Sequence, residues 1–141
     1  MNKIAVIAGA GKLPTLFLNE AVNKGFEVFP IYLFEEADIE VRTYKNSVKF
    51  SIAQVGKIVK YLKTNEIKKL IMLGKVEKKL IFSNLKFDLA ATKILMSTKN
   101  KKDKNILMAI IKYLEQEGIE VMPQNYLLDK YMTKDFDYTK K

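Results

Sequence analysis

The first 25 residues contain the feature that most limits the possible fold: an apolar run, a glycine-rich turn and an amphipathic segment in direct succession. The run Ile4–Ala8 is entirely apolar and ends at Gly9, which is typical of a strand buried on both faces. Pro14 suits the first turn of a helix, where a missing N–H costs no hydrogen bond. Apolar residues then recur at helical spacing up to Gly25. The pattern predicts a β-strand followed directly by an α-helix.

The same alternation continues along the rest of the chain. Strands are predicted at Phe26–Phe34, Ser47–Phe50, Leu70–Leu73 and Ile119–Pro123. Helices are predicted after Ser51–Gln54, whose S-x-x-Q spacing fits a capping box, from Asp88 to Leu95, and from Asp103 to Gly118. Pro30 has no N–H to donate, so its strand is expected to have an edge or a bulge on that side.

Strands that alternate with helices of this length predict βαβ units with right-handed crossovers. We therefore expect an α/β fold, namely a Rossmann-like three-layer sandwich with a mostly parallel sheet. Ligands in such folds bind beyond the carboxyl ends of the strands, where the strand order switches. In this sequence those ends are Gly9–Pro14, Leu33–Asp38 and Gly74–Val76. The length of 141 residues fits one domain of this kind.

Composition restricts the chemistry that such a domain can perform. The chain has no cysteine and no histidine, which excludes disulfides, thiol nucleophiles and thiolate metal sites. Acid or base catalysis would have to use carboxylates, lysine or tyrosine, and a metal site would have to be lined by oxygen. None of the candidate positions offers the paired carboxylates that a metal-assisted hydrolysis of a phosphoanhydride requires.

The net charge of +9 comes almost entirely from lysine, because Arg42 is the one arginine among 25 basic residues. Arginine is the usual bidentate ligand of phosphates and guanines, and the lysines are spread along the chain. We therefore expect a solvated basic surface and no nucleic-acid partner, while attraction to an acidic membrane surface stays open. No apolar run reaches the ~20 residues that cross a bilayer, and the N-terminus is unlike a signal peptide. The expected location is the cytoplasm.

The segment IAGAGKLP (Ile7–Pro14) partly matches the dinucleotide-binding pattern G-x-G-x-x-G. Gly9 and Gly11 supply the first two glycines, whereas Pro14 stands where a third would let the helix pack closely on the strand. The pair Glu35–Glu36 follows the second strand and could bind a ribose hydroxyl. An NAD site is therefore one open interpretation of this segment.

A Walker phosphate loop is a poorer match to the same segment. Leu13 follows Lys12 where a magnesium-binding hydroxyl is needed, and Val6 stands at the position of the upstream glycine. Two interpretations remain beside the NAD site. One is a plain strand-to-helix turn, and the other is an anion site at a helix N-terminus, to which Lys12 adds positive charge.

Four segments carry a family resemblance when they are taken together: IAGAGKLP (Ile7–Pro14), AQVGKIVKYLK (Ala53–Lys63), LIMLGKV (Leu70–Val76) and the helix that starts at Asp103. They resemble the N-terminal domain of bacterial UDP-2,3-diacylglucosamine pyrophosphatases, the lipid A pathway type that is unrelated to metallophosphoesterases. The resemblance runs from Ile4 to about Leu128, in order and at similar spacing. The chain departs from the family pattern at Ala53, at Lys78-Lys79, and after Asp103, where only the first of two aspartates is kept.

The resemblance implies a family that hydrolyses the pyrophosphate of UDP-2,3-diacylglucosamine to UMP and lipid X, with Mg²⁺. In that family a second domain of similar size carries the catalytic aspartate and the metal, and the ligand lies between the domains. Residues 1–128 would then form the Rossmann-like, substrate-binding N-terminal domain, and residues 129–141 a C-terminal tail or linker toward the catalytic domain. The implied partners are UDP-2,3-diacylglucosamine or lipid X, that catalytic domain and, peripherally, the inner-membrane surface.

The resemblance also implies substrate-binding residues at the carboxyl ends of the strands, and no catalytic or metal-binding residue in this chain. The implied binding residues are Gly9, Ala10, Gly11, Lys12, Leu13, Pro14, Gln54, Gly74, Lys75 and Asp103. Two of them have a structural explanation as well, because Gln54 fits a capping-box partner of Ser51 and Asp103 fits a helix N-cap.

Several other segments allow both a structural and a functional interpretation. Glu35, Glu36 and Asp38 favour a solvated turn. The C-terminal aromatic residues could dock a second domain or pack on the domain's own core; they are Tyr126, Tyr131, Phe136 and Tyr138. The apolar residues Ile81-Phe82 and Leu85–Phe87 could border an acyl-chain groove or form a local core.

Two other classes of function stay open on the sequence alone. One is a stand-alone nucleotide- or NAD-binding module, and the other is a basic domain for RNA or a membrane surface. Selective binding of UDP-2,3-diacylglucosamine or lipid X would favour the family's function. Binding of NAD(H) or a bare nucleotide would favour the second class, and salt-sensitive binding of many polyanions the third.

Overall fold

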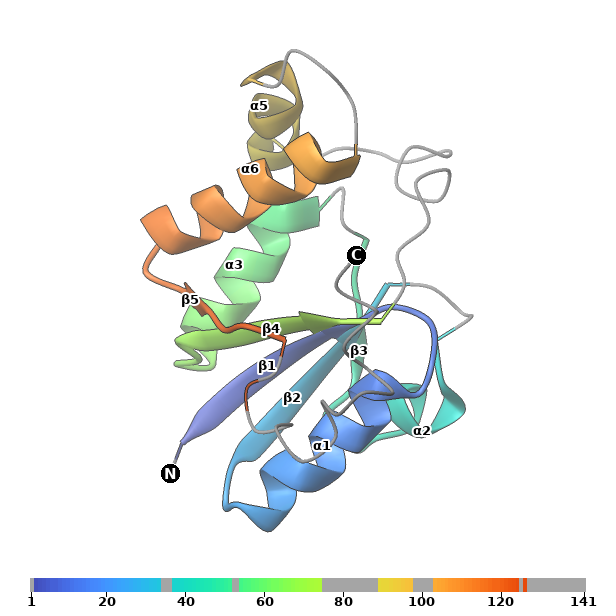
Figure 1. Cartoon of the computed structure of the whole chain (residues 1–141). Helices are drawn as coiled ribbons and strands as arrows, with labels where there is room; N and C mark the ends of the chain where they lie inside the picture. The colour runs from blue at the N-terminus through green and yellow to red at the C-terminus, as the bar shows by residue number, and fades with distance from the viewer. Residues whose placement is uncertain are drawn as a thin grey trace.

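The computed structural model describes residues 2–33, 37–51, 54–74, 89–97, 103–124 and 126. They form a parallel five-stranded sheet in the order β3-β2-β1-β4-β5 (Figure 1). The strands are β1 (Lys3–Ala8), β2 (Glu27–Tyr32), β3 (Val48–Lys49), β4 (Lys69–Leu73) and β5 (Glu120–Val121). The helices are α1 (Leu13–Asn23), α2 (Ile39–Arg42), α3 (Val55–Thr64), α5 (Leu89–Ser97) and α6 (Asp103–Gln116). The predicted α/β, Rossmann-like architecture is confirmed.

Helices cover both faces of the sheet and make it the middle of three layers (Figure 1). α1 and α2 lie on one face, and α3, α5 and α6 lie on the other. Alternate residues of β1 point to opposite layers. Val6 belongs to the core cluster with Phe17 of α1, and Ile7 belongs to the cluster with Ile58 of α3. The apolar run that opens the sequence is therefore buried on both sides, as its composition predicts.

The helices form where the apolar spacing predicts them. The sheet-facing side of α3 carries Val55, Ile58, Val59 and Leu62, each of which is buried. α5 begins at Leu89 and α6 begins at Asp103, close to the predicted starts. Asp88 itself lies outside the described residues.

β2 has an open flank at Pro30, as the missing N–H predicts. The carbonyl oxygen of Tyr32 accepts a hydrogen bond from the backbone N–H of Phe50 at 3.2 Å. The carbonyl oxygen of Val28 accepts one from the side chain of Asn46 at 3.5 Å. Even-numbered residues of β2 therefore face β3, and β3 pairs with β2 only from residue 31 onward. Pro30 precedes Ile31, the first residue of β2 that pairs with β3, so its missing N–H removes no bond of this pairing.

α2 is the helix that the sequence analysis did not predict. It has four residues and lies directly after Asp38, beyond the carboxyl end of β2. A single turn is too short for a helical period to be recognised in the sequence. The helix contacts both β2 and α1, so it brings the segment after β2 close to the start of α1.

Tyr126 packs on the domain's own core. Its ring meets Phe26 edge to face at a centroid distance of 6.2 Å, and Lys69 Nζ lies 5.7 Å from the ring centroid. For Tyr126 the structure thus supports a packed tail and not a docking edge. Tyr131, Phe136 and Tyr138 lie outside the described residues, as do the apolar pairs of 81–87 and the segment 129–141. The proposed boundary at residue 128 stays a prediction.

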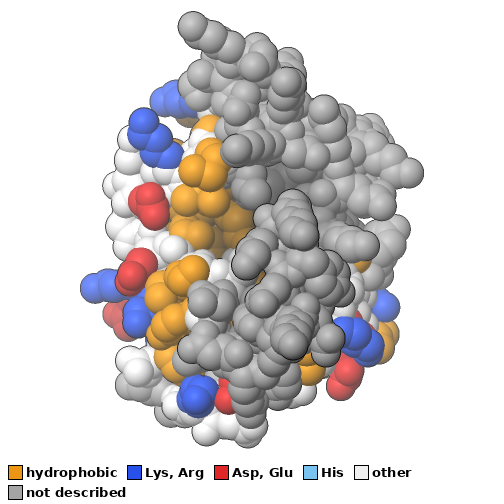
Figure 2. Space-filling view, in the orientation of Figure 1, with side chains coloured by type: hydrophobic (Ala, Val, Ile, Leu, Met, Phe, Trp, Pro, Cys, Tyr) orange, Lys and Arg blue, Asp and Glu red, His pale blue; other side chains and the backbone are white. Residues whose placement is uncertain are grey.

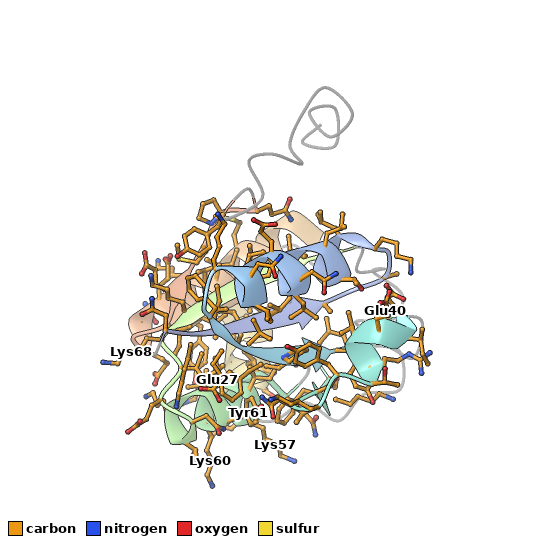
Figure 3. All side chains as sticks on the ribbon, turned by 90° about the horizontal axis from the view of Figure 1, so that it is seen from below. Glu27, Glu40, Lys57, Lys60, Tyr61 and Lys68 are labelled. Carbon is orange, nitrogen blue, oxygen red and sulfur yellow. The ribbon has the colours of Figure 1, made fainter. Side chains whose placement is uncertain are left out.

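Charged side chains of both signs are interspersed on the described part of the face in Figure 2. Figure 3 shows Lys57 and Lys60 extending from α3 away from the sheet. Both observations fit the solvated basic surface that the lysine-rich composition predicts. Among the described residues, no helix has the length and apolar character needed to cross a membrane.

Candidate functional site

The carboxyl ends of β1 and β4 meet in the middle of the sheet, where the strand order switches. The backbone N–H of Gly9 donates a hydrogen bond to the carbonyl oxygen of Leu73 at 2.8 Å. A Cβ atom on Gly74 would lie 2.7 Å from the carbonyl oxygen of Ala10, which is closer than real Cβ contacts allow. Only glycine therefore fits at position 74. The structure thus brings Gly74 against Gly9 and Ala10, which lie far from it in the sequence.

Gly11 and Pro14 shape the turn from β1 into α1. Gly11 has a φ of +103°, a conformation that residues with a side chain rarely adopt. α1 begins at Leu13, and Pro14 lies in its first turn, where the missing N–H removes no helical hydrogen bond. The backbone N–H groups of a first helical turn have no partner within the helix, and they favour anions. We call Gly9–Leu13 the glycine loop.

Asp38 is not the solvated turn residue that the sequence analysis expected. Its side chain is only 7% exposed, and Thr15 Oγ1 donates a hydrogen bond of 2.6 Å to its Oδ2. That bond is the main reason why the pKa of Asp38 lies below the ordinary value of 3.8; Lys12 adds to the lowering, and burial opposes it. The carboxylate is therefore ionised and part of the junction between α1 and α2. Glu35 and Glu36 of the same expected turn lie outside the described residues.

Lys12 is an exposed cation of the glycine loop. Its Nζ lies 3.2 Å from Asp38 Oδ2 and 3.7 Å from Glu40 Oε1, and its side chain is 73% exposed. The hydrogen bond to Asp38 is the main reason why the pKa of Lys12 is raised above 10.5, so the ammonium is charged at neutral pH. Figure 3 shows Glu40 on α2. The site therefore presents a positive charge that two carboxylates partly balance.

The backbone beside Asp38 also contacts the glycine loop. Ala37 forms bridges with Ala10 and Gly11. Arg42 Nε donates a hydrogen bond of 2.9 Å to the carbonyl oxygen of Ala37. The one arginine of the chain thus helps to hold the segment Ala37–Asp38 against the loop.

The remaining predicted site residues have local structural roles or lie outside the described residues. Gln54 Oε1 accepts a hydrogen bond of 3.3 Å from the backbone N–H of Ser51, which is one half of the predicted capping box. Asp103 is the first residue of α6, and its side chain is not described. Lys75 is not among the described residues. Neither Gln54 nor Asp103 is joined to the glycine loop by a contact that the structure describes.

The described residues do not fit the Mg²⁺ that the family resemblance implies. Within the described part of the chain, no three Asp or Glu side chains come together as a metal site. Asp38 and Glu40 share the ammonium of Lys12, and a magnesium ion prefers oxygen ligands that are free of a competing cation. The glycine loop and the ammonium of Lys12 are groups that favour an anion.

Among solved structures, the fold is similar to dTDP-glucose 4,6-dehydratase from Bacillus anthracis in complex with NAD, with a TM-score of 0.54 and 9% identity over 86% of this chain and 36% of that one. For UDP-glucose 4-epimerase from Thermotoga maritima with UDP-glucose, the TM-score is 0.51 and the identity 12%, over 83% of this chain and 35% of that one. For the enzyme WbmG from Bordetella bronchiseptica in complex with NAD and UDP, the TM-score is 0.50 and the identity 15%, over 82% of this chain and 34% of that one. At these identities the similarity shows the fold alone, and the chain spans about a third of each structure.

Comparison with protein families is more specific. No curated protein matches the chain, but the family model described as the LpxI N-terminal domain matches residues 3–131. The match includes the glycine loop, Gly74 and α6, and it confirms the resemblance that the sequence segments carry. The chain therefore belongs to the LpxI N-terminal domain family.

Proposed function

We propose that this chain is the substrate-binding domain of a UDP-2,3-diacylglucosamine pyrophosphatase of the lipid A pathway. The family match over residues 3–131 supports the pathway. The observation that carries the proposal is the close packing of Gly74 against Gly9 and Ala10. This contact lies at the switch in strand order, beyond the carboxyl ends of the strands, where open α/β sheets bind their ligands.

In this proposal the diphosphate of the substrate binds at the start of α1. A Cβ atom added to Gly11 would meet none of the described atoms within 4 Å, so the described residues leave the backbone of the loop accessible. The N–H groups of the first turn favour negative charge. Lys12 supplies an exposed ammonium next to them. Together these features support binding of a phosphate-bearing ligand at this edge of the sheet.

Hydrolysis to UMP and lipid X is assigned to a second domain. The described residues offer no acidic cluster for a metal, so we propose that the catalytic aspartate and Mg²⁺ come from that domain. When bound, the metal would supply charge stabilisation to the diphosphate. Catalysis of phosphoryl transfer depends largely on positioning. The contribution of this chain is therefore to hold and orient the diphosphate.

The competing candidate is an NAD-binding module, since the dehydratase and WbmG structures contain NAD. One observation argues against it. Asp38 lies after β2, on the side where dinucleotide-binding folds place a ribose-binding carboxylate. Both of its oxygens are engaged, by Thr15 and Lys12. A ribose would have to share this carboxylate with an ammonium and a hydroxyl that already bind it, whereas a diphosphate has the charge to attract Lys12.

Phosphorus NMR of UDP-2,3-diacylglucosamine with Mg²⁺ tests binding and turnover together. We expect the substrate signals to broaden when the protein is added, without formation of UMP or lipid X. Gly74→Ala should abolish the broadening, because its Cβ would press on Ala10. Gly118→Ala is the matched control: its φ of +90° is close to the +93° of Gly74, but an added Cβ would meet nothing within 4 Å.

Each other outcome contradicts a defined part of the proposal. Formation of UMP and lipid X would show that catalysis does not need a second domain. Unchanged, sharp signals with a folded protein would exclude substrate binding by this chain. Broadening of NAD signals in place of substrate signals would favour the dinucleotide module. Circular dichroism of each variant verifies that it is folded.

A further inference from the structure

Asp38 joins two parts of the chain at the glycine loop. It precedes α2, and its two oxygens contact Lys12, just before α1, and Thr15, in the first turn of α1. Thr15 Oγ1 donates to Oδ2 at 2.6 Å, and the carboxylate is only 7% exposed. A short hydrogen bond to an ionised acceptor is among the stronger ones in proteins. The contact with Thr15 therefore fixes the position of the carboxylate.

Lys12 is held less firmly than Asp38. Its Nζ lies 3.2 Å from Asp38 Oδ2, yet its side chain is 73% exposed. Its second partner is Glu40, at 3.7 Å, whose side chain is 64% exposed. Ion pairs that are open to solvent contribute little stability. The two carboxylates thus keep the ammonium beside the loop without fixing it there.

A diphosphate at the start of α1 would compete with both carboxylates for this ammonium. It offers several charged oxygens, and lysine binds phosphate as a point charge that can reorient on its flexible stem. When Lys12 moves to the phosphate, Asp38 still accepts the hydrogen bond from Thr15. Ala37 still forms its bridges with the loop. The exchange therefore needs the movement of one side chain and no change of the backbone.

We propose that Asp38 is a positioning residue: it holds Lys12 beside the glycine loop and yields it to the diphosphate of the ligand, while Glu40 competes for the same ammonium. This inference rests on the proposed function, because it requires a diphosphate at the loop. It assigns a distinct task to each group. Thr15 fixes Asp38, Asp38 positions Lys12, and Glu40 lowers the affinity for the ligand.

A double-mutant cycle on Lys12 and Glu40 tests the exchange, with UDP as the probe in calorimetric titrations of the full chain. Glu40→Gln should raise the affinity for UDP about twofold, because the ammonium loses a weak competitor. Lys12→Ala should lower the affinity about fivefold or more. In the Lys12→Ala background, Glu40→Gln should change the affinity much less. Glu120→Gln, at the amino end of β5, removes the same charge far from the loop and should have no effect.

The position of Asp38 is tested through Thr15. Thr15→Val should lower the affinity for UDP, and Thr15→Ser should restore it, because serine keeps the hydroxyl that donates to Asp38. A general packing defect would not be repaired by the smaller serine.

The outcomes separate this inference from the proposed function. An equal gain from Glu40→Gln with and without Lys12 would overturn the exchange, although UDP binding and the proposed function would stand. Failure of Thr15→Ser to restore affinity would overturn the positioning role. If the folded wild-type chain bound neither UDP nor UDP-2,3-diacylglucosamine, the proposed function and the exchange would both be wrong.

Discussion

The two edges of the sheet use glycine for different purposes. At the amino edge, Gly25 and Gly118 follow α1 and α6 with φ values of +91° and +90°, and an added Cβ would meet nothing within 4 Å. At the carboxyl edge, Gly74 has nearly the same φ of +93°, yet an added Cβ would lie 2.7 Å from the carbonyl oxygen of Ala10. The backbone conformation is shared, and the surroundings are not.

The difference shows which glycines mark a candidate site. At the amino edge, glycine lets the chain turn from a helix into the next strand. At the carboxyl edge, Gly74 lets the backbones of two strand ends touch, while Gly11 with its φ of +103° forms the turn into α1. The charged groups differ in the same way. Asp38 is nearly buried beside the glycine loop, whereas Lys63 on α3 and Glu117 after α6 form a partly exposed pair.

The largest expected effect comes from adding one methyl group at each edge. Gly74→Ala combines a strained φ with a backbone clash and should lower the free energy of unfolding by about 3 kcal/mol. Gly118→Ala carries the strain alone and should cost about 1 kcal/mol. Denaturant unfolding of both variants measures the difference. Equal losses would mean that the contact between Gly74 and Ala10 does not constrain the fold.

The next largest effect is expected when the hydroxyl groups of two threonines are removed and the losses of stability are compared. Thr15→Val removes the donor to the nearly buried Asp38 carboxylate, so the free energy of unfolding should fall by about 1–2 kcal/mol. Thr43 Oγ1 donates to the carbonyl oxygen of Ile39 at 2.7 Å in an exposed setting. Thr43→Val should therefore change stability by less than about 0.5 kcal/mol. A larger loss of stability in Thr43→Val than in Thr15→Val would show that the hydrogen bond to Asp38 is not the stronger of the two.

The pH dependence of stability should report on Asp38. Because its folded pKa lies below the ordinary 3.8, it binds fewer protons than the unfolded chain does in that range. Its stabilising contribution is present above about pH 4 and is lost as the pH falls through the folded pKa. Asp38→Asn should flatten the stability curve below about pH 4.

The same measurement ranks the two partners of Asp38. Thr15→Val should flatten the curve more than Lys12→Ala, since the hydrogen bond from Thr15 is the larger cause of the lowered pKa. Thermal unfolding of the wild type and these variants across acidic pH provides the curves. An unchanged slope in Asp38→Asn would show that other carboxylates determine the acid sensitivity.

The smallest effect is expected at the exposed pair of the amino edge. Lys63 Nζ lies 2.7 Å from Glu117 Oε1, with side chains 53% and 34% exposed. Glu117→Gln should cost less than about 1 kcal/mol, and added salt should reduce the loss further. UDP affinity should not change. A clear loss of UDP binding in this variant would remove the distinction between the two edges.

Local patterns in the sequence were sufficient for most of the fold. β1, Pro14 and α3 follow from an apolar run, a fixed φ and a helical period, and the capping contact between Ser51 and Gln54 spans three residues. α2 was missed because one turn shows no period.

The contacts of the site join residues that are far apart in the sequence. Asp38 meets Thr15 across 23 positions and Lys12 across 26. A local pattern holds no information about such a pairing, so the sequence predicted a solvated turn instead. Likewise, glycine at position 74 was recognised as the end of a strand, but its contact with Ala10 depends on the order of the strands in the sheet.

Chemical-shift mapping of backbone amides with UDP tests the central claim most directly. The account predicts the largest changes at Gly9–Leu13 and Gly74, while the amides of Gly25 and Gly118 keep their positions. Changes that concentrate at the amino edge would contradict it. So would changes that spread over the lysines of α3 and disappear as salt is raised, because that behaviour belongs to a general polyanion surface.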